Sequence, residues 1–168
     1  GLAVVTSLGS SKSATGEAAG LGQVDSTVVA VTIDANGKIV KCVIDAAQTK
    51  INFDANGKIT SDKTKEIKTK QELGNDYNMK GKSGIQKEWF EQANAFAAYV
   101  VGKTVAEVKG IALNESGAPT GSDLTGSVTI HVNDFIAAIE KAAANAKDLG
   151  ARANDKLGLG IVTSISDS

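Results

Sequence analysis

The sequence predicts an α+β fold in which an antiparallel β-sheet, arranged as a meander, packs against two principal helices. Three observations favour this fold. β-branched runs alternate with two copies of the turn Asp-Ala-Asn-Gly-Lys in the first 60 residues, and two apolar patterns of helical period follow Ser83 and Asn133. The 168 residues, 42% of them hydrophobic, are sufficient for one domain with a single core.

The sheet is expected over residues 26–60. Thr27–Ile33, Ile39–Ile44 and Thr49–Phe53 are the predicted strands, because each is rich in β-branched or alternating apolar residues. An Asn-Gly pair is a strong hairpin signal, so Asn36-Gly37 and Asn56-Gly57 should both lie at hairpin tips. The alternative for these turns, a calcium loop, needs a glutamate at its twelfth position, and neither copy has one. Residues 9–26, rich in Gly, Ser and Ala, are predicted to form a loop.

The first principal helix is expected to begin with the capping box Ser83-x-x-Gln86, after an exposed and irregular segment over residues 61–82. Gly102 should end this helix, and a shorter one should run from Thr104 to Gly110. In the first principal helix, apolar residues at spacings of three and four predict the buried face: Ile85, Trp89, Ala93, Phe96 and Val100.

Ser127–Val132 is predicted to be a further strand, because of its Val-Thr-Ile content. Asn133 should cap the second principal helix, which Gly150 closes. The residues expected on its buried face are Phe135, Ile136, Ile139, Ala143 and Ala146.

The two ends of the chain repeat each other. Residues 1–11 and 158–168 carry nearly the same sequence. We therefore expect residues 1–157 to form one unit of a tandem array, with residues 158–168 opening the next unit. Both copies should be extended and occupy comparable sheet environments. Because the chain begins with Gly1 and not with methionine, it is interpreted as a processed or excised product.

Composition bounds the chemistry. The 18 basic and 19 acidic residues leave a formal charge of −1, which argues against a general electrostatic interaction with nucleic acid or acidic lipid. No stretch reaches the length of a membrane span, so membrane association would need an anchor outside this sequence. Cys42 is the sole cysteine, and its apolar neighbours favour a buried residue over a reactive thiol. His131, the sole histidine, belongs to no catalytic motif and is interpreted as structural, and no metal site is expected.

Two segments resemble a known family. Lys80-Gly-Lys-Ser-Gly-Ile85 leads into a helix that ends in Tyr99-Val-Val-Gly-Lys103, and Asp123-Leu-Thr-Gly-Ser-Val-Thr129 precedes the last helix. Both resemble segments of bacterial FMN-binding domains, which include the C subunit of the sodium-pumping NADH:quinone oxidoreductase, and the resemblance spans residues 26–147. In that family the signature Asp-x-x-Ser-Gly-Ala-Thr attaches the flavin through its last threonine. Here Gly126, Ser127 and Val128 replace Ser, Gly and Ala, and the Glu-Thr-Pro that precedes the family's first helix is missing.

The resemblance implies an FMN cofactor and a site on both segments. Thr129 would be the attachment position, the glycines would allow close approach, and the lysine and tryptophan would supply charge and a stacking surface. The implied cofactor-binding residues are Thr129, Asp123, Gly126, Ser127, Lys82, Gly84 and Trp89. In the structural alternative, Trp89 belongs to the core and the glycines are caps. Because Val128 is β-branched, we expect Thr129 to lie in a continuous strand and to carry no flavin.

The expected function follows from this resemblance. The chain would be an extracytoplasmic FMN-binding-like domain at the cell surface, one unit of a tandem surface protein used in flavin-based electron transfer. Its partners would be neighbouring repeats and a redox protein. The alternative is a catalytically silent surface lipoprotein repeat that has a structural role or binds a ligand or partner. In both cases the domain is an electron-transfer or binding module more than an enzyme, and no motif supports a hydrolase or a transferase.

Overall fold

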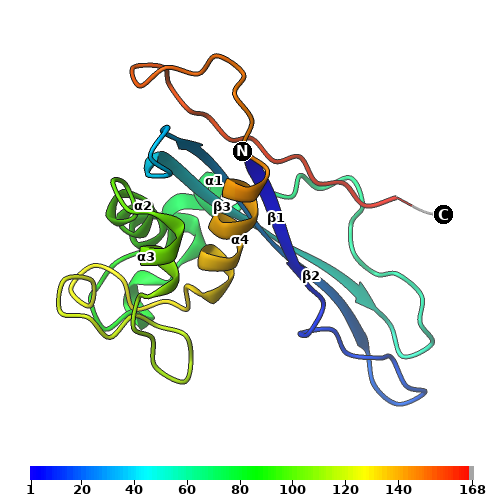
Figure 1. The fold of residues 1–168 in the computed structure, drawn as a ribbon. Helices are drawn as coiled ribbons and strands as arrows, with labels where there is room; N and C mark the ends of the chain where they lie inside the picture. Colours follow the sequence, from blue (N-terminus) through cyan, green and yellow to red (C-terminus); the bar gives the residue numbers. More distant parts are fainter. Residues whose placement is uncertain (167–168) are drawn as a thin grey trace.

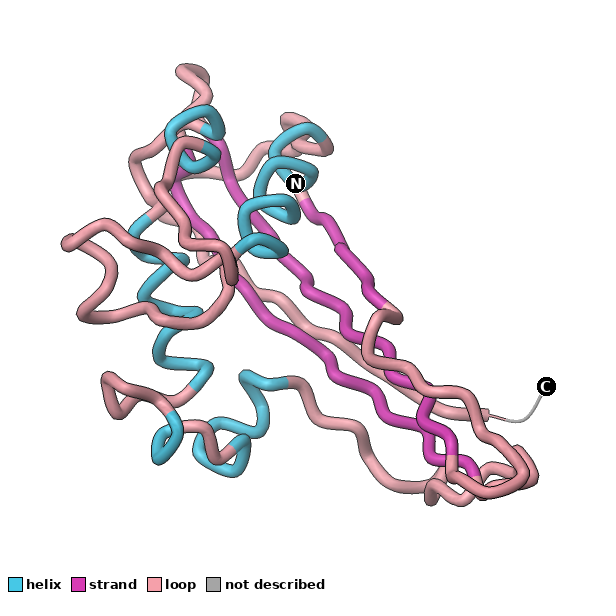
Figure 2. The backbone as a smooth tube through the Cα atoms, turned by 90° about the horizontal axis from the view of Figure 1, so that it is seen from below, coloured by secondary structure: helices cyan, strands magenta, loops and turns pink. Residues whose placement is uncertain are grey.

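The computed structural model describes residues 1–166 and confirms the α+β class. One antiparallel sheet has the order β1-β2-β3. Its strands are β1 (Leu2–Ser7), β2 (Gly20–Ile33) and β3 (Ile39–Phe53). The helices are α1 (Lys70–Leu73), α2 (Trp89–Tyr99), α3 (Val105–Lys109) and α4 (Asn133–Ala144), and the 3-10 turns η1 (Gly74–Tyr77) and η2 (Lys80–Lys82) lie between α1 and α2. The helices gather over the hairpin end of the sheet, and the opposite ends of β2 and β3 project beyond them (Figures 1 and 2).

The β2–β3 hairpin is longer than expected. Its turn is the predicted one, with Gly37 at φ +74° and the Asp34 carboxylate accepting hydrogen bonds from the backbone N–H groups of Asn36 and Lys38. The two strands predicted within 39–53 are one continuous strand, and β2 begins at Gly20, inside the segment expected to be a loop. Pairing along the full length of β2 overrides the weak strand propensity of residues 45–48.

The second Asn-Gly turn does not lead into another strand. Asp54 accepts the same two backbone hydrogen bonds, from Asn56 and Lys58, and Gly57 has φ +84°. Beyond this turn only one isolated bridge, between Phe53 and Ile59, continues the pairing. The meander predicted over residues 26–60 is therefore wrong in its last part.

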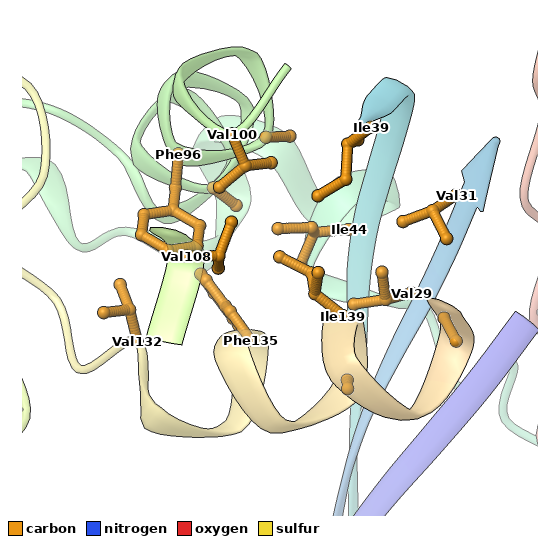
Figure 3. Packing of buried hydrophobic residues seen from close by; sticks show 14 of the residues in the cluster. Val29, Val31, Ile39, Ile44, Phe96, Val100, Val108, Val132, Phe135 and Ile139 are labelled. Atoms are coloured by element: carbon orange, nitrogen blue, oxygen red, sulfur yellow. The ribbon is translucent and has the colours of Figure 1, made fainter. Parts of the chain in front are cut away.

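The core lies between the hairpin end of the sheet and the helices. Phe96 from α2 and Val100, its C-cap residue, meet Phe135 and Ile139 from α4 over Ile44 of β3 (Figure 3). All five are buried, and Trp89 is only 5% exposed. The predicted burial of Trp89, Phe96 and Val100 is confirmed, whereas Ile85 is only half-buried.

Helix α2 begins six residues after Ser83. Gln86 adopts a left-handed conformation with φ +55°, which interrupts a helix at that point. Glu88 is the N-cap, and its backbone N–H donates to the Glu91 carboxylate at 2.8 Å. The Glu88 side chain is 3% exposed and accepts from the backbone N–H groups of Met79 and Lys80, at 2.8 and 3.0 Å. The predicted capping box at Ser83 is therefore wrong, and Glu88 both caps α2 and holds the preceding loop.

The strand predicted over 127–132 is absent; these residues form turns and loop. Val128 and Val132 are fully buried, but the backbone N–H groups between them bond elsewhere, so no ladder forms. Helix α4 begins at Asn133 as its first residue and ends at Ala144, before the predicted stop at Gly150. The buried face of α4 comprises Phe135, Ala138, Ile139 and Ala142. The predicted burial of Phe135 and Ile139 is confirmed. Ile136, Ala143 and Ala146 were also predicted on this face, but they are not among its buried residues.

The two similar ends of the chain differ in structure. Residues 1–8 contain β1, whereas 158–166 form neither helix nor strand and run extended across the outer face of the sheet (Figures 1 and 2). The expectation of comparable sheet environments is therefore wrong, and residues 167–168 of the repeat lie outside the described part. Among residues 1–166, no helix has the length and apolar character that a bilayer crossing requires.

Candidate functional site

A cavity of about 330 Å³ opens where the inner face of the sheet continues beyond the core. This volume lies near the lower end of the range for small-molecule sites, roughly 300–1,000 Å³. The strands contribute Ser7, Asp25, Ser26, Thr27, Ala46, Ala47 and Gln48, and the helices and loops contribute Lys70, Trp89, Ser116, His131, Asn133, Asp134 and Phe135.

Two aromatic rings form the apolar wall of the cavity. Trp89 and Phe135 pack edge to face, with ring centroids 5.8 Å apart and planes at 86°. The Lys70 ammonium lies 5.2 Å from the Trp89 ring centroid and 4.8 Å from that of Tyr77. The Trp89 and Tyr77 rings therefore hold the positive charge of Lys70 beside the cavity through cation–π contacts.

The strand wall is polar and its groups are ordered by hydrogen bonds. The Asp25 carboxylate accepts from the Gln23 amide at 2.8 Å and from the Gln48 amide at 2.9 Å. Asp134, in the first turn of α4, adds a second carboxylate to the lining. The lining therefore carries two carboxylates, those of Asp25 and Asp134, against the one ammonium of Lys70. Such a lining suits a polar ring system better than a free anion.

Helix α4 begins at the cavity, because Asn133, Asp134 and Phe135 are its first three residues and all line it. The first turn of a helix presents backbone N–H groups without intrahelical partners, together with the positive end of the helix dipole. The N-cap residue Val132 offers no side-chain oxygen to these groups. An acceptor on a ligand can therefore bind at this end of the cavity.

Gln92 joins the two segments that resemble the flavin-binding family. It is fully buried in α2, and its amide N–H₂ donates to the Ser83 hydroxyl at 3.1 Å and to the Lys87 carbonyl at 3.2 Å. Its amide oxygen accepts from the Thr129 backbone N–H at 2.8 Å, from the Thr129 hydroxyl at 3.2 Å and from the Ile130 N–H at 3.2 Å. Gln92 was not predicted as a site residue, although a glutamine three positions after Trp89 on an apolar helix face is a recognisable signal.

Thr129 lies in an exposed loop four residues before α4 begins. The expectation that Val128 would draw it into a strand is wrong, since Val128 enters the core as a single buried side chain. Thr129 is exposed as a residue, and its hydroxyl donates to the buried Gln92 amide oxygen at 3.2 Å. It lies two residues before His131, which lines the cavity.

Apart from Trp89, the other residues implied by the resemblance lie outside the cavity lining. Asp123 accepts the Tyr99 hydroxyl at 2.6 Å, and this hydrogen bond raises the pKa of Tyr99. Tyr99 ends α2 and Trp89 begins it, about 15 Å apart along the helix axis.

Ser127 donates its hydroxyl to the Leu124 carbonyl at 3.1 Å within the same turn. Gly126, Lys82 and Gly84 are exposed, and a Cβ at either glycine would meet open space. Of the seven implied residues, the cavity lining includes Trp89 alone, and Thr129 reaches α2 through Gln92.

The remaining candidates have structural roles in the described residues. Cys42 is partly buried against the core, not fully buried as expected, and this burial raises the pKa of its thiol to about 12, which argues against a reactive thiolate. The Asp34 and Asp54 carboxylates accept backbone hydrogen bonds within their turns, as hairpin residues do. His131 is exposed at the cavity, a position that the sequence interpretation did not predict.

Comparison with known proteins adds a partial relationship. No protein-family model matches the chain, and no solved structure does either. A chlorophenol reductase of Desulfitobacterium hafniense is 36% identical to this chain over 94 residues. The alignment covers 49% of this chain and 29% of the reductase, so the chain spans less than a third of that relative's length. The similarity connects the chain with a redox-related protein.

Proposed function

We propose that this chain is a flavin-binding redox module that holds FMN at the cavity beside α4. The observation that carries the proposal is the cavity itself, which is bounded by Trp89 and the first turn of α4 and lies next to the exposed Thr129 loop. The partial similarity to a reductase supports a redox role.

The lining residues fit the ring end of FMN. The aromatic edge of Trp89 and the hydroxyl and amide groups of Thr27 and Gln48 suit a planar ring with a polar pyrimidine edge. Thr129 would hold the phosphate outside the carboxylate-lined cavity, as the attachment position that the family resemblance implies. Bound FMN would supply the electron transfer, and the protein would position it and control its exposure.

The cellular setting is a proposal of its own. We infer from the family resemblance that the module works outside the cytoplasm, at the cell surface, and exchanges electrons with a redox protein. Association with a membrane would depend on an anchor beyond the sequence described here.

Intact-mass measurement tests the cofactor directly. The chain, produced together with a flavin transferase, should gain the mass of one FMN ester and a yellow colour, and Thr129→Ala should lose both. Thr125→Ala is the matched control, because Thr125 lies in the preceding turn and should leave incorporation unchanged. Absence of any mass gain would contradict covalent attachment.

Titration with free FMN addresses binding without attachment. Trp89 borders the cavity, so FMN bound there should quench its fluorescence, and Gln48→Ala should weaken binding by removing an amide from the lining. Saturable quenching in Thr129→Ala would show that the ring recognises the cavity independently of the ester. No quenching and no mass gain together would leave no support for a flavin.

A specific observation favours a second candidate. Asp25 and Asp134 give the cavity two carboxylates against the single charge of Lys70, an arrangement that also suits a small neutral or cationic polar ligand. The alternative function is therefore a redox-silent binding module. Binding of such ligands without any response to FMN would favour this alternative.

A further inference from the structure

Residues 158–165 repeat residues 1–8 with five identical positions of eight, and the other three exchange small or aliphatic residues. Residues 2–7 form β1, which pairs with β2 in an antiparallel register from Leu2 opposite Ala30 to Ser7 opposite Asp25. The two segments thus share a sequence but have different surroundings.

The β1 position makes strict demands on its occupant at the first residue. A Cβ added to Gly1 would lie 1.8 Å from the Ala142 carbonyl oxygen and 2.9 Å from the Ala146 nitrogen, so α4 leaves room for glycine alone. Gly1 also exchanges two backbone hydrogen bonds with Val31, at 2.8 and 2.9 Å.

Further along β1, small and apolar residues face inward. Ala3 is 4% exposed, and Val5 packs against the core. On the outer face of the sheet, the hydroxyls of Thr6 and Ser26 lie 3.1 Å apart. The β1 position therefore requires glycine, then a small residue, then valine, then threonine, at positions one, three, five and six.

Residues 158–163 satisfy the same demands, with Gly158, Gly160, Val162 and Thr163 at the matching positions. Where the segment now lies, the two glycines and the valine have no structural reason. A Cβ at Gly158 or Gly160 would meet nothing within 4 Å, and Val162 is 97% exposed. Its sequence fits the β1 position and not its present location.

The free edge of β1 is recognised through its backbone. The Lys141 ammonium donates to the Val4 carbonyl at 3.0 Å, and the Asn145 amide donates to the Leu2 carbonyl at 3.1 Å. Backbone contacts of this kind accept any strand with the same path. The exchanges of Val4 for Ile161 and of Leu8 for Ile165 change side chains alone, so the backbone carbonyls that accept such hydrogen bonds remain available.

We propose that residues 158–165 are the β1 strand of a second copy of this unit, joined head to tail, and that they pair with β2 of that copy. The β1 position of the present unit is already filled by residues 2–7, so a second copy provides the matching vacancy. Residues 145–157 form neither helix nor strand, and thirteen residues span up to about 45 Å when extended, which is enough to reach the next unit. This proposal is independent of the flavin.

A fused chain tests the proposal. Residues 1–165 are joined directly to residue 9 of a second copy, so that residues 158–165 supply its first strand. Because each unit contains one buried tryptophan, Trp89, two folded units should give twice the fluorescence change of the 168-residue chain on unfolding in urea.

Two substitutions make the test specific. Gly158→Val should move half of the unfolding amplitude of the fused chain to lower urea, because the added side chain meets α4 of the second unit, and should leave the 168-residue chain unchanged. Val162→Asp should behave in the same way, because it places a carboxylate against the core. Gly1→Val is the positive control and should lower the urea midpoint of the 168-residue chain. A second unit that fails to fold, or Gly158→Val and Val162→Asp variants with unchanged midpoints in the fused chain, would overturn the proposal.

Discussion

Gln92 is the residue that most directly connects the core with the candidate site. A single buried amide accepts three hydrogen bonds from the Thr129 segment and donates two to the loop before α2. Leaving a buried polar group without its partner costs roughly 1–3 kcal/mol. The position of Thr129 therefore depends on a side chain in a different element.

Gln92→Leu should lower the free energy of unfolding by about 2–3 kcal/mol, because the backbone N–H groups of Thr129 and Ile130 lose their acceptor. Urea unfolding followed by Trp89 fluorescence measures this loss. Gln86→Leu is the matched control, since Gln86 is exposed and its loss should change stability by less than about 0.5 kcal/mol. Equal effects of both substitutions would show that the Gln92 network contributes nothing.

Cys42 should be unreactive in the folded chain. Burial raises the pKa of its thiol from the ordinary value of 9.0 to about 12, so the folded state favours the protonated form. Its contribution to stability is therefore fully present below about pH 9 and is lost as the pH rises toward 12. A thiol reagent at pH 8 should react slowly with the native chain and at once in denaturing urea. The free energy of unfolding of the native chain should fall relative to that of Cys42→Ala only above pH 9.

At the scale of elements, the two Asp-Ala-Asn-Gly-Lys turns show what local sequence determines and what it does not. Both form the same turn, with the same aspartate hydrogen bonds and a glycine at positive φ. Only the first joins two long strands, and the second closes a single bridge between Phe53 and Ile59, because a strand also needs a neighbouring strand and an apolar face to pack. The turn was predictable from five residues, and the strand that was expected after it was not.

This difference predicts that the same glycine-to-alanine substitution lowers the free energy of unfolding by different amounts in the two turns. Gly37→Ala forces a side chain into a left-handed conformation at the tip of the β2–β3 hairpin, and should cost about 1–2 kcal/mol of global stability. Gly57→Ala imposes the same local strain on a turn followed by one isolated bridge, and should cost clearly less because that turn can open locally. Urea midpoints of the two variants provide the comparison. A larger loss for Gly57→Ala would mean that the second turn belongs to the cooperative core.

The failed strand at 127–132 has a physical explanation. Its alternation of valine and isoleucine satisfies the strand pattern, but a ladder also needs backbone donors, and Gln92 binds those of Thr129 and Ile130 while the Gly117 carbonyl binds that of Val132. Propensity alone cannot predict this competition. A buried glutamine on the face that carries Trp89 was visible in the sequence, so the involvement of α2 was predictable even though its partner was not.

At the scale of the whole molecule, the core was predictable and the cavity was not. Helical spacing identified Trp89, Phe96 and Val100 as buried because each element carries its own pattern. The cavity depends on the register that places Asp25 opposite Gln48 and on the helices covering only one end of the sheet. No local pattern contains that information, which explains why Lys70, Thr27 and Gln48 were absent from the expected site.

The segment after residue 157 contributes little to this unit. Leu159, Ile161 and Ile165 are half-buried on the outer face of the sheet, and each contributes on the order of 1 kcal/mol. The alternate residues Gly158, Gly160 and Val162 are exposed, so the segment buries little apolar surface. The contact with the outer face is therefore weak, and the segment can detach without unfolding the sheet.

A chain that ends at residue 157 should keep its free energy of unfolding within about 1 kcal/mol of the 168-residue chain. It should also bind more of an apolar dye, because removing residues 161–166 exposes more of Val28 and Ile51, which line the same hollow on the outer face. Ile161→Asp in the 168-residue chain is the matched control: it should reproduce the increase in dye binding by releasing the segment, with the chain length unchanged. A loss above about 2 kcal/mol on truncation would contradict the prediction, because it would mean that residues 158–166 belong to the cooperative core of this unit.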